Sequence, residues 1–356
     1  MKTKSNLAFW VSAFACVSTT ALAGGKHASI KPQGHAPIGV MGDHLHKAGE
    51  WMMSYRYMTM SMSGNQQGSK SIIDNDIATG IENPFANPPM SPPTVRVVPQ
   101  DMTTQMHMFG VMYAPSDDIT LMAMVNYLDK EMDLKTYQGG MGVNVLGRFT
   151  TNSSGISDAK LGLLYRLYDN AIHHVHLNAN WQVPTGNIDE SGEALTPMNM
   201  KMTMRLPYGM QLGTGSNHLE LGATYNGFSD EFSWGGQALY NAVIDDNDED
   251  YRWGDSLTIQ GWASYQVSDA ISASLRVIYR HQDEIDGMDK MIMAPVTTAN
   301  SANYGGNFID TAIGVNTVVA NKHRFALEYQ LPIEHDVNGV QMEMEHMVTL
   351  GYQLAF

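Results

Sequence analysis

The sequence predicts an all-β fold, an antiparallel transmembrane β-barrel of twelve strands. Two observations lead to this prediction: strand-like segments alternate between an apolar and a polar face, and both ends of the chain resemble those of an exported outer-membrane protein. A repeat of two residues with one apolar and one polar face is typical of transmembrane β-strands, which contact lipid on one side and the lumen on the other. We therefore expect residues 50–356 to form the barrel.

The first predicted strand shows the alternation clearly and is rich in methionine. Within residues 51–62, Trp51 and Tyr55 lie on one face, whereas Arg56 and Met58 share the other face with further methionines. Because the polar face of such a strand lines the lumen, the sequence predicts a methionine-bearing lumen with charges of both signs. The residues predicted to line it are Arg56, Met58, Met60, Met62, Met106, Met108, Met112, Met122, Met124, Lys130, Lys160, Arg166, His174, His176, Arg276, Arg280, Arg324 and Glu328.

Twelve segments have this strand pattern. They are residues 50–62, 103–115, 119–131, 156–168, 172–184, 216–227, 231–242, 255–267, 270–282, 306–319, 322–332 and 343–355. Single-chain bacterial barrels have an even number of strands, with short turns at the periplasmic end and longer loops at the other end. The count of twelve requires residues 208–212 to be a loop.

The chain ends predict a bacterial outer-membrane location. Residues 1–23 combine two lysines, an uncharged run and a small-residue cleavage site, as a secretory signal peptide does. Residues 24–49 are expected to form a periplasmic N-terminal segment with histidine and methionine. The last strand ends at Phe356 and resembles the signal read by the barrel assembly machinery, so we expect that machinery, outer-membrane lipid and lipopolysaccharide as partners.

Composition narrows the function classes. The formal net charge of −15 disfavours nucleic acid as a partner. The single cysteine, Cys16, lies in the predicted signal peptide, so the mature chain is expected to form no disulfide. An outer-membrane enzyme is a third class of function, but the sequence contains neither the G-x-S-x-G nor the H-E-x-x-H motif, and we assign no catalytic residues.

Four short motifs resemble a known family. They are Trp-Gln-Val-Pro-Thr-Gly at 181–186, Gln-Leu-Gly-Thr-Gly-Ser at 211–216, Phe-Ser-Trp-Gly-Gly-Gln at 232–237 and Tyr-Arg-Trp-Gly-Asp at 251–255. Together with the alternating strands, they resemble a family of outer-membrane transporters associated with phenol meta-cleavage pathway genes. The resemblance covers most of the mature chain and implies a barrel with a transport role, without a defined substrate.

The methionine and histidine content leaves two functions open. Thioethers favour Cu(I) or Ag(I), and imidazoles suit Cu(II), Zn(II) and Ni(II), so passage of a soft metal is one hypothesis. Its candidate ligands are His35, Met41, His44, His46, Met198, Met200, Met202 and Met204. For His44 and His46, a solvated tail is the simpler interpretation. Methionine is also an adaptable apolar filler, so the other hypothesis is a passive channel for small apolar or aromatic solutes.

Two loops suggest further roles. Residues 83–99 contain six prolines, so they cannot form regular strand and are predicted to fold into the barrel mouth as a constriction. The acidic run 245–250 has oxygen ligands that suit Ca²⁺. Because it lacks the glycine and distal glutamate of an EF-hand loop, a solvated loop or a divalent-bridged contact with lipopolysaccharide is the simpler interpretation.

Overall fold

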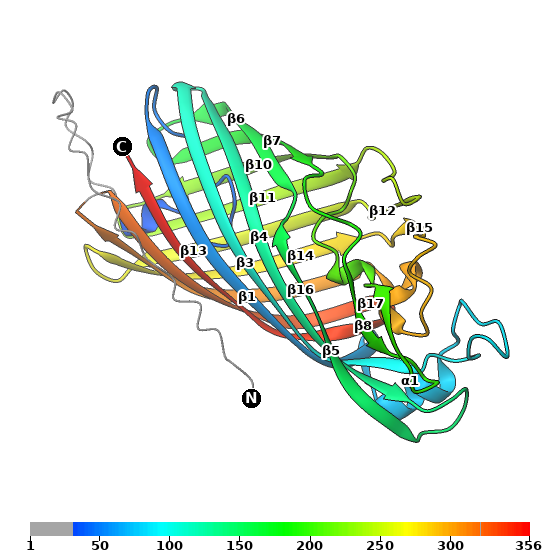
Figure 1. Cartoon of the computed structure of the whole chain (residues 1–356). Coiled ribbons are helices and arrows are strands. Elements are labelled where there is room, and N and C mark those ends of the chain that lie inside the picture. The colour runs from blue at the N-terminus through cyan, green and yellow to red at the C-terminus, as the bar shows by residue number, and fades with distance from the viewer. Residues whose placement is uncertain (1–30, 321) are drawn as a thin grey trace, which may run out of the picture.

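The structure, a computed structural model, describes residues 31–320 and 322–356 and shows a closed antiparallel β-barrel (Figure 1). Neighbouring strands in the ring are hydrogen-bonded, and the last strand pairs with the first, which leaves no free edge in the ring. In order around the ring, the strands are β1 (Trp51–Gly68), β3 (Val97–Ser116), β4 (Ile119–Tyr137), β6 (Ala159–Asp169), β7 (His173–Val183), β10 (His218–Phe228), β11 (Phe232–Val243), β13 (Ser256–Gln266), β14 (Ile271–Gln282), β16 (Gly306–Val319) and β17 (His323–Ala355).

The element β17 differs from the others because it pairs with different neighbours along its 33 residues. Its first part, up to Val337, pairs with β16, whereas its last part, from Val337 to Ala355, pairs with β1. Between the two parts, Gly339 has a φ of 57°, a conformation that favours glycine. The rings of Tyr329 and His346 stack with their centroids 5.6 Å apart, so the two parts of β17 lie against each other.

Short turns join the strands at one end of the barrel, and the remaining elements lie on the longer connections, most of them at the other end (Figure 1). These elements are β2 (Lys70–Ile72), α1 (Asp74–Gly80), β5 (Val145–Ile156), the hairpin β8 (Ser191–Leu195) and β9 (Lys201–Arg205), the pair β12 (Tyr251–Arg252) and β15 (Asp286–Gly287), and the 3-10 turns η2 (Tyr208–Met210), η3 (Thr297–Ala299) and η4 (Ser301–Asn303). Among the described residues, no helix is long and apolar enough to cross a membrane.

The observed strands agree with the predicted segments except at the loop end. Strands β1, β3 and β4 each run six residues further than predicted, and β5 pairs with the extension of β4. The prediction missed β5 because residues 150–154 are all polar and show no alternation. Residues 208–212 form a 3-10 turn and loop, as the strand count required.

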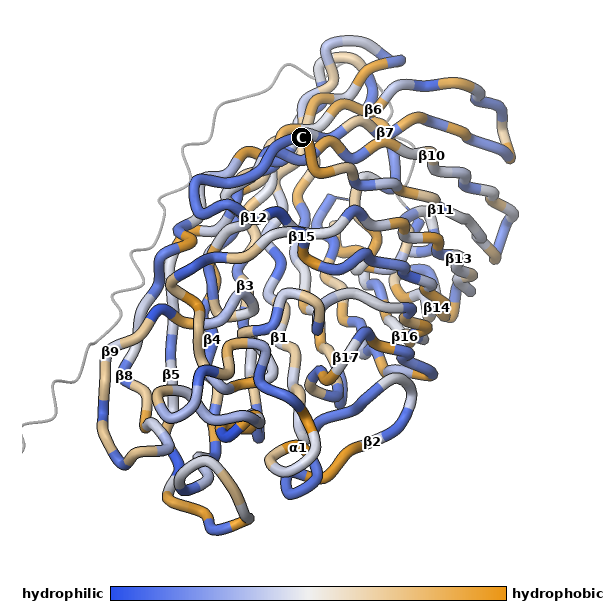
Figure 2. The backbone as a smooth tube through the Cα atoms, turned by 90° about the vertical axis from the view of Figure 1, so that its right-hand side faces the viewer, coloured by the Kyte–Doolittle hydropathy of each residue, from blue (hydrophilic) through white to orange (hydrophobic). Residues whose placement is uncertain are grey.

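The two faces of the barrel follow from the alternation along each strand. In β14, Leu275 and Val277 are 53% and 52% exposed on the outer face, whereas Arg276 and Ile278 are each 6% exposed on the inner face. Apolar and polar residues alternate along the barrel strands in Figure 2. The outer face is therefore an apolar band suited to lipid, and the inner face contacts the residues that lie within the lumen.

We predict that arginine on the outer face destabilises the folded barrel according to depth. Val277 lies in the middle of β14, so Val277→Arg is expected to cost about 2–4 kcal/mol of folding free energy in a bilayer. The matched control is Val267→Arg, which lies in a short turn and is expected to cost about 0–1 kcal/mol. Reversible unfolding in lipid vesicles measures both, and equal costs would contradict a transmembrane β14.

Candidate functional site

Methionines face one another across three neighbouring strands of the ring. Met62 of β1 lies opposite Met102 of β3, which lies opposite Met132 of β4, and Met58 lies opposite Met106 in the same wall. Residues paired directly across strands share one face of a sheet. The pairing therefore builds a continuous methionine surface on the inner wall.

This methionine surface lines an inner cavity of about 330 Å³ in the lumen. Its apolar wall comprises Met58, Met60, Met62, Met102, Met106, Leu128, Met132, Val340 and Met342. The polar groups are few, and Lys130 and Tyr304 are the largest of them. A largely apolar cavity with a few polar groups is the usual form of a small-molecule site.

Two inward-folded connections close the inner cavity on the loop side. The ammonium group of Lys130 donates to the carbonyl oxygens of Gly209 and Gln211, at 2.9 Å and 2.6 Å. The amide of Gly209 donates to the Tyr304 hydroxyl at 3.1 Å, which joins the connection around η2 to the one around η4. Burial raises the pKa of the Tyr304 phenol, so this group stays protonated.

An apolar cluster forms the centre of this closure. Its buried members are Val97, Met102, Met132, Leu134, Leu206, Tyr208, Met210, Tyr251, Ile285, Ile292, Val296 and Ala299. We call residues 206–212 and 292–304 the roof, because they supply half of this cluster and bound the cavity. The sequence predicted that residues 83–99 form the constriction, and the roof is the part that the prediction missed.

The roof separates the inner cavity from an outer cavity of about 310 Å³ among the long loops. All four methionines of the 198–204 run line the outer cavity, together with Met90, Met293, Phe149, Leu195 and several prolines. The run begins in the turn of the β8–β9 hairpin and continues into β9, where Met202 lies opposite Ala194, and Met198, Met200 and Met202 are exposed. Met132 borders both cavities, and the roof lies between them.

The N-terminal segment fills the other end of the lumen. We call residues 31–46 the plug; they include the 3-10 turn η1 (Pro32–Gly34) and lie inside the ring (Figure 1). His176 and Asn178 of β7 bond to the carbonyl oxygen of Gly42, at 2.9 Å and 3.0 Å, and Gln237 of β11 donates to the carbonyl of Met41 at 2.9 Å. Polar side chains of the barrel thus satisfy backbone groups that a plug without regular structure leaves free.

The prediction of a solvated tail is therefore wrong for the plug. Ile38 is 2% exposed and Val40 is 1% exposed, although the sequence around them has no strand or helix periodicity. Residues 24–30 and the predicted signal peptide lie outside the described residues. A non-periodic segment gives no signal of burial, because its partners lie on strands distant in sequence.

A buried ion pair supports the middle of the plug. Arg276 pairs with Glu328 and also donates to Gln260 at 2.7 Å. A side chain at Gly39 would overlap both the Arg276 guanidinium and the Glu328 carboxylate, so the plug passes this pair at a glycine. Arg324 donates to the carbonyl of Ala36. These two lumen cations therefore contact the plug.

The other residues predicted to line the lumen lie in four places. Against the plug, Arg56 contacts the Met41 sulfur, and the pairs Arg56–Met108 and Met112–Met122 lie on the same wall with Met124. Lys160 pairs with Glu220 at 3.3 Å. At the short-turn end, Arg166 and His174 both pair with Asp169. Arg280 lies above the roof-side ring of Phe308, with its guanidinium carbon 4.4 Å from the ring centroid, and is exposed.

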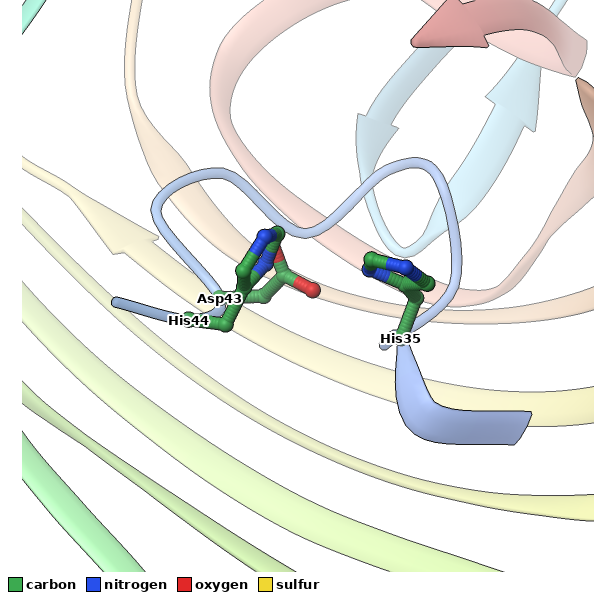
Figure 3. A group of neighbouring side chains, drawn as sticks. All are labelled: His35, Asp43 and His44. Carbon is green, nitrogen blue, oxygen red and sulfur yellow. The ribbon is translucent and has the colours of Figure 1, made fainter. Parts of the chain in front are cut away.

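The predicted metal ligands divide between two ends of the barrel. His35, Asp43 and His44 come together in the plug, with the Asp43 carboxylate between the two imidazoles (Figure 3), and the ring of His46 lies 4.8 Å from that of His44. Burial lowers the pKa of His46 to about 3 and that of His35 well below its usual value. Asp43 was not among the predicted ligands. Met41 faces Arg56 instead, and the 198–204 run lies among the long loops at the outer cavity.

The acidic run 245–250 has separate partners for four of its carboxylates, and the longest of these contacts joins Asp246 to Arg252 at 3.8 Å. Asp245 accepts from the Asn217 amide, Glu249 pairs with Arg205, and Asp250 pairs with Lys290. Hydrogen bonds from Asn217 lower the pKa of Asp245, as expected for a carboxylate that stays ionised in a loop. Calcium binding at this run stays a prediction.

Comparison with known proteins supports the fold. No protein-family model and no curated protein matches the sequence. Among solved structures, an outer membrane channel from Pseudomonas putida F1 matches with a TM-score of 0.57 and 14% identity, over 88% of this chain and 98% of that chain. The toluene transporter TodX from P. putida matches at a TM-score of 0.44 and 12% identity, over 86% and 90% of the chains. The translocator domain of the autotransporter NalP from Neisseria meningitidis matches at 0.46 and 9%, over 88% and 91%.

We predict that a side chain at Gly39 releases the plug. Gly39→Leu is expected to raise single-channel conductance in planar bilayers, because leucine separates the plug from the Arg276–Glu328 pair. The matched control is Gly34→Leu, since no atom lies within 4 Å of a Cβ atom added there. Equal conductance in Gly39→Leu and the unmodified protein would contradict a seated plug that blocks the pore.

Proposed function

We propose that this protein is a channel of the bacterial outer membrane for passive passage of small apolar or aromatic solutes. The observation that carries the proposal is the series of two methionine-walled cavities, of about 310 and 330 Å³, on either side of one apolar roof. A dry apolar cavity of about 150 Å³ holds one benzene molecule. Each cavity therefore has room for a substituted aromatic ring.

The chemistry of the walls supports solutes of varied shape. Methionine has three flexible torsions and a polarizable sulfur, so its side chain adapts to different ligands and makes favourable contacts with aromatic rings. Lys130 is the main charge at the inner cavity, and its ammonium group is already bonded to two roof carbonyls. Recognition there depends on shape and dispersion more than on charge.

Passage requires movement at two places, the roof and the plug. Hydrogen bonds connect the roof to its surroundings, including those of Lys130 and Ser153 and those from the amides of Arg96 and Val97 to the Pro295 carbonyl. Apolar, non-directional contacts form the rest of the closure. A solute that binds the open arrangement more tightly shifts the population towards it. The movement needs no energy source beyond the solute gradient.

We infer that the ring has twelve passes, because β17 contributes two. Its parts pair with β16 and β1 on opposite sides, Asn338 and Gly339 lie between them, and Asn-Gly is a preferred two-residue hairpin turn. If the chain crosses the ring twelve times, the first and the last residue of the barrel both lie at the short-turn end. That arrangement suits an outer-membrane barrel whose termini are periplasmic.

Fold likeness and sequence resemblance support the transport role. The P. putida F1 structure is described as an outer membrane channel and has the same fold. The four short motifs resemble transporters associated with phenol meta-cleavage genes, which suits aromatic cargo. Export by the predicted signal peptide and a non-enzymatic role belong to the same proposal.

Soft-metal passage is the weaker explanation of the methionines. A thioether path needs sulfur ligands placed around a common point, whereas the cavity walls mix methionine with leucine, valine, proline and phenylalanine. Such mixed walls suit apolar solutes. Replacing Met198, Met200, Met202 and Met204 together by leucine separates the hypotheses, because leucine keeps the apolar volume and removes sulfur.

We predict that an amide in the inner cavity weakens solute binding. Met60→Gln is expected to lower the affinity for toluene roughly tenfold, because burying an unpaired amide costs about 1–3 kcal/mol. Titration of the detergent-folded protein with toluene, combined with uptake into proteoliposomes, measures the effect. The controls are Met60→Leu, which keeps the wall apolar, and Met141→Gln, at a loop residue that is 83% exposed. A similar small effect for all three variants would reject the inner cavity as the solute site.

A further inference from the structure

We propose that His35, Asp43 and His44 bind a divalent transition-metal ion, with Zn²⁺ as the reference ion, and that this ion fastens the plug. The ligand atoms of the three residues all lie within 4.8 Å of one another (Figure 3). In a tetrahedral zinc site with bonds of about 2.0–2.1 Å, neighbouring ligand atoms are roughly 3.3 Å apart. Small side-chain rotations therefore bring the group to a bonding arrangement.

His46 supplies a second, independent observation. Its imidazole is next to that of His44, its side chain is 5% exposed, and its Nε2 atom has no hydrogen-bond partner among the described residues. The other nitrogen, Nδ1, faces the Glu50 carboxylate at 3.6 Å. A carboxylate behind one ring nitrogen is the usual support for a histidine that binds metal through the other. His46 lies outside the three-residue group but beside His44, and we include its Nε2 atom in the proposal as the fourth ligand.

The space beside the histidines suits an ion. A small cavity of about 20 Å³ is lined by His35, His44 and His46, and the Nδ1 atom of His35 is buried without a partner. The Asp43 carboxylate accepts a hydrogen bond from the Ala36 amide at 3.1 Å, so it is already fixed in place. Imidazole nitrogens with one carboxylate oxygen are a common ligand set for zinc.

Two cations border the same cavity and oppose binding. Lys322 and Arg324 both line it. Arg324 is held away by bonds from its guanidinium to Asn316 and Gln353, at 2.7 Å and 2.6 Å, and to the Ala36 carbonyl. The carboxylates of Asp43 and Glu50 supply the compensating negative charge.

The position of the ligands gives the ion a mechanical role. His35 precedes the part of the plug that passes the Arg276–Glu328 pair, and Asp43 and His44 follow it. A bound ion thus closes residues 36–42 into a loop. The closed loop has fewer conformations available when the plug is released, so release gains less conformational entropy. This inference does not depend on the identity of the solute, because Zn²⁺ binding is measured without transport.

The test is calorimetric titration of the detergent-folded full chain, prepared without a histidine tag, with Zn²⁺. We expect one saturable site that is weakened at least about tenfold in His35→Ala and His44→Ala. Asp43→Asn is the conservative variant, because the amide oxygen still accepts from Ala36 while the charge is lost. The control is His281→Ala, since His281 faces Asp283 at 3.3 Å on an exposed surface near the long loops. Co²⁺ absorption provides a second readout of the ligand set.

The outcomes are distinct. A single site that is lost in the plug variants and kept in His281→Ala supports the proposal. Absence of saturable binding, or binding that survives His35→Ala and His44→Ala, overturns it. Either negative result leaves the solute channel unaffected, whereas failure of toluene binding alone would leave the metal site standing.

Discussion

Closure of the ring is the constraint on which the rest of the structure depends. Once β1 pairs with β17, alternate residues of every strand must point into an enclosed lumen, and the others must contact lipid. Buried polar groups without partners are costly, so the inner face needs either water or protein to bond with it. In this protein the plug supplies those hydrogen-bond partners at the short-turn end. The wall of the inner cavity is mostly methionine, so few of its side chains need a hydrogen-bond partner.

The lumen therefore has two chemically different halves. Around the plug, histidine, asparagine, glutamine and arginine side chains bond to backbone carbonyls, which fixes the plug in one position. Below the roof, flexible methionine side chains form a wall that permits several arrangements of similar energy. This division suits the proposed channel, because the polar contacts hold the plug and the methionine wall can accept an apolar solute.

Period-two alternation predicted most of the ring because it depends only on neighbouring residues. The same reasoning failed where structure depends on distant partners. The polar run at 150–154 in β5 lacked the alternation, the plug had no period at all, and the roof around Tyr208 resembled an ordinary loop. The sequence pattern identified Arg276 and Glu328 as inward-facing residues, but it could not show that they pair with each other beneath Gly39.

The most direct test of the account is to locate a solute inside the barrel. Crystals grown with bromobenzene and measured at the bromine absorption edge would show where an aromatic ring binds. The account predicts bromine density within the inner or outer cavity, in contact with methionines such as Met60 or Met200. Bromine found only on the lipid-facing surface, with both cavities filled by ordered water, would contradict the central claim that the methionine walls form a path for apolar solutes.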